Sequence, residues 1–529
     1  MNEREFNLLY EPWVMVLTQE GKMVEVSLLT ALERAHVFRG LAGELPTQDV
    51  AILRLLLATL YATFTRVDTH GNRNPIETAN EALERWESIW KLGRFPFESI
   101  KRRLCHYEER FYLFHPTRPF YQVANLDKGT NYSTAKLLGN ISESSNKVRL
   151  FPIRTGEMKR TLTFAEASRW LLYLNAFDDT SSKPSIRGQK MLSPGAGWLG
   201  KLGLIYATGT SLFETLMFNF VLLNDNGDPW NSGKAIWEID DPRIDERVEI
   251  AIPHDPLTLL TLQSRRILLQ RDRNKVTGYQ LLGGDFFQKE NAFTEQMTLW
   301  RKDIKEDVYT PKRHDPTKQL WRDFSALLAD EDNQKKSGII RWISILTDLG
   351  HLNKLITFQI AGVKYGDKDF FVTNVFQDSL SINSNILSQF EKYWVTRITR
   401  LIAITEECVN HIFFLAVDLA KASGGSDSLH RKAGYATGNA ARVEAYFMLD
   451  MPFRRWLAVI DPAQTDIDTA EQDWKDTVKR LLIKLGKEMT DLTGEKGIVG
   501  RWVNKRLYTA PGAFVEFCSK IKNTLKKGG

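Results

Sequence analysis

The sequence predicts an α+β fold, with a large mixed body over residues 1–380 followed by a four-helix bundle over residues 381–529. Short apolar runs bounded by turn residues, which are typical of strands, occur only in the first of these regions. From about residue 386 the pattern changes to long stretches with helical spacing, joined by short links that contain Gly or Pro. A chain of 529 residues is also too long for a single hydrophobic core, so more than one domain is expected.

The first part of the predicted body combines a hairpin with buried helices. Two apolar runs, Val14–Thr18 and Met23–Leu28, flank the turn residues 19–22 and predict a β-hairpin. Thr47 is expected to cap a helix over Val50–Phe64, which is apolar on nearly every side and should lie in the core. Two further helices are expected over Asn80–Leu92 and Thr163–Asn175. The second has a capping box between its residues 163 and 166.

The rest of the body is expected to be richer in strands. Three short strands are predicted: Val248–Ile252, Arg266–Gln270 and Val276–Leu282. The alternating runs Thr357–Lys364 and Asp369–Thr373 predict a second hairpin, in which Gly366 and Asp367 supply the turn. The charged residues of this turn indicate that its tip is exposed.

The C-terminal region is predicted to be entirely helical. Its four helical stretches are Ile386–Ala422, Leu429–Ile460, Ala463–Lys487 and Val499–Leu525, the last interrupted near Pro511. Because the links between them are short, neighbouring helices should run antiparallel and form a bundle.

The composition is that of a soluble globular protein, with 43% hydrophobic and 26% charged residues. Three scattered cysteines without a C-x-x-C pair argue against a disulfide framework and a zinc ribbon. The longest apolar stretch, residues 204–223, contains Glu214 and Asn219 and is interpreted as core, not as a membrane span. The N-terminus lacks a signal-peptide pattern, so a cytoplasmic location is expected.

Positive charge gathers at the C-terminal end. Between residues 501 and 529, seven basic residues stand against a single acid, which accounts for the whole net charge of +6. Two interpretations remain open, namely a polyanion bound near this end, or a solvated helix face with a frayed terminus.

The stretch Ser193–Gly203 (SPGAGWLGKLG) places four glycines within eleven residues. Glycine is used where the backbone needs positive φ or where another backbone comes close. Trp198 and Lys201, which lie among these glycines, would suit a flat, anionic ligand such as nucleic acid. A long surface turn is the alternative interpretation, and the stretch alone does not exclude it.

Motifs of catalysis are missing from the sequence. It contains no P-loop, H-E-x-x-H, G-x-S-x-G or EF-hand pattern, and its nine histidines are scattered. The acidic residues between 238 and 246 favour a solvated loop over a metal site, and the polar, basic residues 143–160 predict a surface loop. A binding or scaffold protein is therefore favoured over the alternative of a nucleic-acid enzyme, which would need a metal cluster or a phosphate loop.

Several segments together resemble the CasA family, the large subunit of Cascade, which is the type I-E CRISPR surveillance complex. The segments are Phe6–Trp13, Arg39–Asp49 and His115–Phe120, together with the glycine stretch and Arg442–Asp461. The resemblance covers essentially the whole chain, and its N-terminal motifs are the most specific.

This resemblance implies a non-catalytic subunit without a cofactor. Its function would be to recognise the PAM, the short motif beside the target, in the minor groove of double-stranded DNA and to help open the duplex for guide RNA. The implied partners are double-stranded target DNA, the guide RNA complex, the other Cascade subunits and a helicase-nuclease that docks on this chain. No membrane partner is implied.

The resemblance also places three DNA-contacting elements. The glycine loop looks like Gly195, Ala196, Gly197 and Trp198. The wedge that enters the duplex looks like Tyr365, Gly366, Asp367, Lys368 and Asp369. The basic loop looks like residues 151–160, with Phe151, Arg154, Lys159 and Arg160. Relatives can carry a glutamine in the wedge, which this turn lacks, and a lysine in the groove, for which Lys289 is the candidate here.

Overall fold

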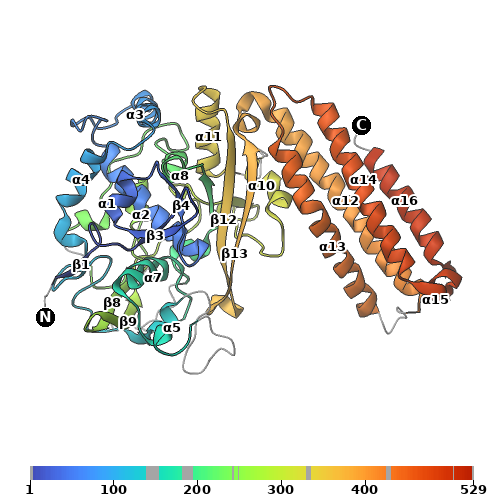
Figure 1. The fold of residues 1–529 in the computed structure, drawn as a ribbon, viewed down its shortest axis with the longest axis horizontal. Coiled ribbons are helices and arrows are strands. Elements are labelled where there is room, and N and C mark those ends of the chain that lie inside the picture. Colours follow the sequence, from blue (N-terminus) through green and yellow to red (C-terminus); the bar gives the residue numbers. More distant parts are fainter. Residues whose placement is uncertain are drawn as a thin grey trace. The chain divides into compact units, whose positions relative to one another are not determined.

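The computed structural model divides into two compact units, which are described separately (Figure 1). Unit 1 comprises residues 1–318, 330–343 and 357–379, and unit 2 comprises residues 319–329, 344–356 and 380–529. The residues described are 4–138, 154–181, 195–240, 243–247, 249–328, 335–424, 431–503 and 505–526.

Helix α2 (Pro46–Phe64) is the centre of the core of unit 1. Nearly all of its side chains are buried, and it packs against α4, α7, α8 and α9. The apolar sequence predicted this burial, but the predicted cap at Thr47 is wrong because Leu45 holds the N-cap position and Pro46 opens the helix. The other helices of unit 1 are α1 (Leu28–Glu33), α3 (Ala79–Leu92), α4 (Phe97–Cys105), α5 (Thr134–Leu137), α6 (Glu157–Arg160), α7 (Phe164–Phe177), α8 (Leu212–Asn219) and α9 (Pro256–Leu260).

Helix α7 illustrates a start that the local sequence determines. The Thr163 side chain accepts a hydrogen bond from the Glu166 amide, and the Glu166 carboxylate accepts one from the Thr163 amide at 2.8 Å. This reciprocal pair satisfies two amides that the helix itself cannot, and it confirms the predicted capping box.

The strands of unit 1 form small sheets. Three sheets have three strands each, in the orders β3-β2-β4, β6-β9-β8 and β13-β12-β7, and two pairs are β1-β5 and β10-β11. The bounds are β1 (Glu5–Asn7), β2 (Val14–Thr18), β3 (Met23–Val26), β4 (Phe38–Leu41), β5 (Tyr112–Phe114), β6 (Thr130–Ser133), β7 (Ile205–Thr208), β8 (Arg265–Asp272), β9 (Lys275–Gly283), β10 (Trp300–Asp303), β11 (Val308–Pro311), β12 (Leu355–Tyr365) and β13 (Val372–Asn383). The two predicted hairpins are thereby confirmed as β2-β3 and β12-β13.

One strand prediction fails. Residues 249–252 lie in a loop, and the neighbouring Arg247 makes only an isolated bridge with Asp285. The acidic residues between 238 and 246, which were predicted to lie in a solvated loop, are also not all exposed to solvent. Glu238 is buried between Arg66 and Arg103, and Glu246 is buried as well. Ion pairing compensates the burial of Glu238, a contact between residues too distant in sequence to be expected from a local pattern.

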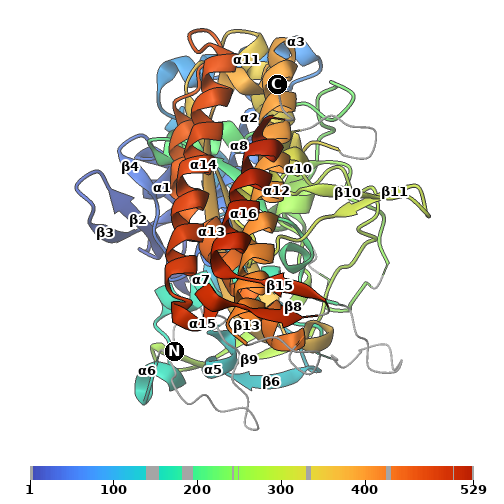
Figure 2. The ribbon, with the colours of Figure 1, turned by 90° about the vertical axis from the view of Figure 1, so that its right-hand side faces the viewer.

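Unit 2 contains a bundle of four long helices within the described residues, and Figures 1 and 2 both show them side by side. They are α12 (Lys392–Ala422), α13 (Arg431–Ala458), α14 (Ile467–Asp491) and α16 (Ala510–Lys526). Shorter elements are α10 (Phe324–Leu328) and α15 (Gly494–Val499), while α11 (Gly338–Asp348) contributes residues to both units. The α+β class and the helical C-terminal region are as predicted.

The end of the bundle differs from the prediction. Instead of one interrupted helix from residue 499, the chain forms a small antiparallel pair, β14 (Arg501–Val503) and β15 (Arg506–Tyr508), before α16. Pro511 does not break a helix, because it lies in the first turn of α16, where proline costs no intrahelical hydrogen bond.

Candidate nucleic-acid interface

The described part of the glycine stretch is mostly buried. From residue 195 to residue 203, only Gly195 and Lys201 keep appreciable exposure. Gly195 has φ +80°, the left-handed backbone that a side chain disfavours. Ser193 and Pro194 lie outside the described residues. From residue 195 to residue 203 the chain is therefore neither a long surface turn nor an open loop.

The other glycines allow the protein's own chain to come close. A Cβ on Gly197 would lie 2.4 Å from the Ala176 carbonyl oxygen, and one on Gly203 would lie 1.8 Å from that of Lys312. A Cβ on Gly200 would meet the Tyr365 hydroxyl. These separations are too short for any side chain, so packing within unit 1 alone requires glycine at the three positions.

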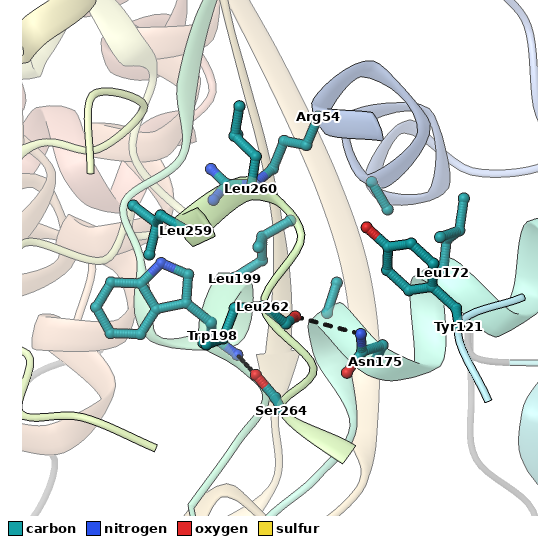
Figure 3. Close-up of a pocket in the computed structure, with 12 residues that line it drawn as sticks. Arg54, Tyr121, Leu172, Asn175, Trp198, Leu199, Leu259, Leu260, Leu262 and Ser264 are labelled. Atoms are coloured by element: carbon teal, nitrogen blue, oxygen red, sulfur yellow. Dashed lines mark hydrogen bonds between the residues drawn. The ribbon is translucent and has the colours of Figure 1, made fainter. Parts of the chain in front are cut away.

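Trp198 also points inward. Its side chain lines a small cavity of about 30 Å³, and its amide donates to the Ser264 hydroxyl at 3.3 Å (Figure 3). The indole nitrogen donates to Glu295 at 2.7 Å, and that carboxylate forms a bidentate pair with Arg54 of α2 at 2.8 and 2.9 Å. Trp198 is only 5% exposed, and Ala196 is buried beside it. Both side chains thus act in the core.

The turn between β12 and β13 has the opposite character. Asp367, Lys368 and Phe370 are exposed, and Lys368, Asp369 and Phe371 all have positive φ, at 55°, 58° and 40°. Left-handed backbone at three side-chain-bearing residues is unfavourable and is typical of functional loops. Gly366 and Asp367 lie in the turn as predicted, but Gly366 has φ −71° and the left-handed positions lie after it.

Contacts within unit 1 hold this turn against the glycine stretch. Tyr365, which was predicted to lie in the exposed tip, is buried and donates from its hydroxyl to the Phe177 carbonyl at 2.7 Å. Its ring packs with Ala196 and Val372. Asp369 pairs with Arg313 at 2.9 Å. The structure thus brings together two elements that are about 170 residues apart in the sequence.

Cations gather where these two elements meet. The Arg265 guanidinium donates to the Gly195 carbonyl at 2.8 Å and pairs with buried Asp178. Lys201 and Arg265 lie over the same Phe286 ring, with Nζ and Cζ at 5.2 and 5.5 Å from its centroid.

The environment of Lys201 disfavours its charge. Burial, and then the charges of Arg265, Lys289 and Arg313, lower the pKa of Lys201 to about 8. An ammonium group that is partly buried among other cations would be stabilised by an anion, so this position suits a phosphate. The sequence offered Lys201 as a cation for an anionic ligand but gave no sign of Arg265 and Arg313, because only folding brings these residues together with Lys289.

Phe370 was also missed. It is 40% exposed at the tip of the turn, next to Asp369. An exposed aromatic ring on a charged β-turn would have been the available signal, because such rings stack on or insert between bases.

The basic loop is described only from Arg154 onward, so Phe151 lies outside the described residues. Arg154 is bound within the protein, to Glu44 at 2.6 Å and Glu166 at 3.0 Å. Lys159 and Arg160 lie on the short helix α6, where the Arg160 side chain is 79% exposed. Of the predicted loop residues, Arg160 is therefore the most accessible cation.

The residues of the described ranges include no group of three or more His, Cys, Asp or Glu side chains arranged to hold a metal ion. Among the same residues, every helix is too short or too polar to cross a membrane. The fold and the site together define a protein with an α+β unit that carries clustered cations beside an exposed, strained turn, and a second unit built around a helical bundle.

The chain belongs to the CRISPR-associated protein Cse1 family, whose pattern it matches over residues 7–485. It is 32% identical over 330 residues to the CRISPR-associated protein CasA/Cse1 of Thermus thermophilus. That match spans 61% of this chain and 60% of the length of the relative.

Solved structures share the fold over the whole chain. Cse1 of Thermobifida fusca superposes with a TM-score of 0.84 at 29% identity, covering 99% of this chain and 98% of the other. Cse1 of Acidimicrobium ferrooxidans gives 0.79 at 23% identity, with 100% and 99% covered. A chain of a CRISPR RNA-guided surveillance complex gives 0.69 at 18% identity, with 99% and 100% covered.

Proposed function

We propose that this chain is a non-catalytic subunit of an RNA-guided surveillance complex that recognises the PAM in target DNA and helps to open the duplex. The comparison with solved structures supports the proposed place in such a complex, because a chain of the same fold is part of a CRISPR RNA-guided surveillance complex. Base pairing with the guide would read the target sequence, and this chain would read only the short motif beside it.

The turn between β12 and β13 carries the proposal. Lys368 and Phe370 project from a backbone with three left-handed residues, and contacts to the rest of unit 1 hold that backbone in place. An exposed ring can insert between base pairs and unstack them, while a nearby lysine offsets phosphate charge. We therefore assign the wedge to Lys368 and Phe370, with Tyr365 as its buried anchor.

The cation cluster would contact the DNA backbone beside the wedge. Lys201, Lys289 and Arg313 supply charge there, and they come from separate segments of unit 1. Of the predicted glycine loop, Gly195 is the residue with exposed surface for direct contact with a groove, while Ala196, Gly197 and Trp198 are buried behind it. Their role in this proposal is to position Gly195 and Lys201.

The bundle of unit 2 would serve subunit contacts. Val443, Phe447 and Met451 follow one another at helical spacing on α13 and are each more than half exposed. A continuous exposed apolar row of this kind marks a protein interface, and another subunit of the surveillance complex is the proposed occupant. Docking of a helicase-nuclease stays a prediction of the family resemblance.

Duplex opening in the assembled complex tests the wedge. A fluorescent base analogue placed beside the PAM reports unstacking, and Phe370→Ala should reduce the opened fraction about tenfold because base stacking on a ring is lost. Phe390→Ala, which removes a ring that is 81% exposed in unit 2, is the matched control and should behave like the wild type.

Affinity for the duplex tests the proposed role of the Lys368 charge. Lys368→Ala should weaken binding several-fold and reduce the slope of log affinity against log salt by about one, while Lys22→Ala, in the exposed turn of the β2-β3 hairpin, should change neither. Wild-type opening by Phe370→Ala together with wild-type affinity of Lys368→Ala would refute the assignment.

A further inference from the structure

A second basic site lies in unit 1, where the C-terminal end of α2 faces α4. It is a cavity of about 280 Å³, close to the lower end of the volumes of small-molecule pockets. Its lining residues come from α2, from the loop that follows it and from α4: Ala62, Thr63, Arg66, Val67, Gly71, Ser99, Arg102, Arg103 and His106.

Two of the three lining arginines share one buried carboxylate. Arg66 donates both Nη groups to Glu238, at 2.8 and 3.0 Å, and Arg103 donates Nη2 to the same side chain. Burial alone would raise the pKa of Glu238, but hydrogen bonds and charge from Arg66 and Arg103 outweigh it and lower that pKa. The carboxylate is therefore ionised, and it neutralises only one of its two guanidinium partners.

Arg103 is held in place with one donor unused. Its guanidinium lies over the Tyr107 ring, with Cζ 5.4 Å from the centroid. Its Nε is buried and has no hydrogen-bond partner among the described residues. A buried donor without an acceptor is unfavourable, and a bound anion would relieve it.

Arg102 and Ser99 complete the polar side of the cavity. Within the described ranges, neither the Arg102 guanidinium nor the Ser99 hydroxyl has an ion pair or hydrogen bond. Gly71 stands opposite with φ +85°, and a Cβ there would lie 3.0 Å from Ser99 Oγ and 3.6 Å from Arg102 Nη1. Without a side chain at Gly71, this edge of the cavity stays open.

The charges around the cavity do not balance. Three guanidinium groups, those of Arg66, Arg102 and Arg103, line the site. Glu238 pairs with Arg66 and Arg103, and the carboxylate of Asp68, in the loop after α2, is engaged by the amides of its own turn, at 2.9 Å from His70 and 2.8 Å from Asn72. Three lining arginines against these two carboxylates leave a net positive site.

We propose that this cavity binds an organic phosphate of about mononucleotide size, with Arg102 and Arg103 on the phosphate and Ala62 and Val67 beside the organic part. Planar guanidinium groups match the geometry of phosphate oxygens, and Ser99 offers a further donor. The volume exceeds what a bare phosphate needs, and the apolar residues suit a sugar or base. The site is independent of the proposed DNA wedge and uses none of its residues.

Calorimetric titration of the full chain with adenosine 5′-monophosphate tests the proposal. Arg102→Ala should weaken binding at least tenfold, because a charged hydrogen-bond donor to phosphate is lost, without affecting the fold. Lys101→Ala removes the same charge from the next residue of α4, outside the cavity, and should bind like the wild type. Absence of binding by the wild type, or equal binding by Arg102→Ala and the wild type, would overturn the proposal.

Competition identifies the source of the phosphate. Inorganic phosphate and a five-nucleotide single strand without terminal phosphates are each titrated against bound adenosine 5′-monophosphate. If the strand displaces adenosine 5′-monophosphate, with the strand concentration counted as phosphate groups, the ligand is a nucleic-acid backbone. If only inorganic phosphate displaces it, the ligand is a free nucleotide. Displacement by neither overturns the proposal, because the phosphate group would then not determine binding.

Discussion

The glycine stretch and the β12-β13 turn lie against each other in unit 1, yet they use their backbones in opposite ways. In the stretch, Gly197, Gly200 and Gly203 have no side chain because other parts of the protein occupy that space. In the turn, Lys368, Asp369 and Phe371 keep their side chains although their φ angles favour glycine. One element is glycine-rich for packing, and the other retains side chains at a conformational cost.

This difference shows which of the two is the better indicator of a binding surface. A glycine-rich segment in a sequence does not reveal whether its close neighbour is a ligand or the protein itself. Strained backbone at exposed side chains is a stronger indicator, since folding alone would favour glycine there. Three predictions test this contrast, from the largest expected effect to the smallest.

Gly203→Ala should destabilise the protein by more than about 3 kcal/mol, because the new Cβ would overlap the Lys312 carbonyl and force the backbone apart. Gly40→Ala is the control, since a Cβ there meets nothing within 4 Å, and it should stay within about 0.5 kcal/mol of the wild type. Urea denaturation gives both values. A Gly203→Ala variant as stable as Gly40→Ala would mean that the stretch is not held by its own packing.

Lys201→Met should stabilise the protein at pH 7 by about 1–3 kcal/mol, because the buried ammonium is removed. The pKa of Lys201 is lowered to about 8 from its ordinary value of 10.5. Between these values the unfolded chain holds a proton that the folded chain has released, so wild-type stability rises with pH.

The stability difference between Lys201→Met and the wild type should therefore shrink from pH 8 towards pH 10. Denaturation at pH 7, 8.5 and 10 measures it. The same variant should bind target duplex more weakly in the assembled complex. A variant that is less stable than the wild type at pH 7 would show that Lys201 is already compensated within the protein.

Lys368→Gly should be more stable than Lys368→Ala by about 1 kcal/mol, because glycine adopts the left-handed backbone of position 368 without a Cβ clash. Both variants lack the lysine charge, so both should lose the same several-fold affinity for duplex. Thermal unfolding and binding of the pair separate strain from charge. Equal stability of the two variants would remove the argument that this turn is strained.

Much of the fold was predictable because neighbouring residues determine it. The capping box at Thr163 starts α7, the turn residues 19–22 close the β2-β3 hairpin, and the apolar residues of Val50–Phe64 bury α2. Each of these depends on contacts within a few residues. The small β14-β15 pair was missed because its two short strands lie inside a stretch that otherwise has helical spacing.

The candidate site was predictable only in part. Gly195 and Lys368 were found as members of motifs, whereas the burial of Trp198 and Tyr365 was not expected from their positions in the sequence. Whether a side chain in a loop is exposed depends on distant segments, here on Glu295 for Trp198 and on the Phe177 carbonyl for Tyr365.

By itself, the sequence determined the α+β class, the helical C-terminal region and the family, because local periodicity and specific N-terminal segments carry that information. Only the tertiary structure decided which glycines pack against other parts of the protein, which charged side chains form ion pairs and which cations cluster together. Lys201, Arg265 and Arg313 come from three separate segments of the chain, and Arg66, Arg103 and Glu238 from three others. The physical reason is that burial and electrostatic energy depend on distance in space, and folding alone makes these separations short.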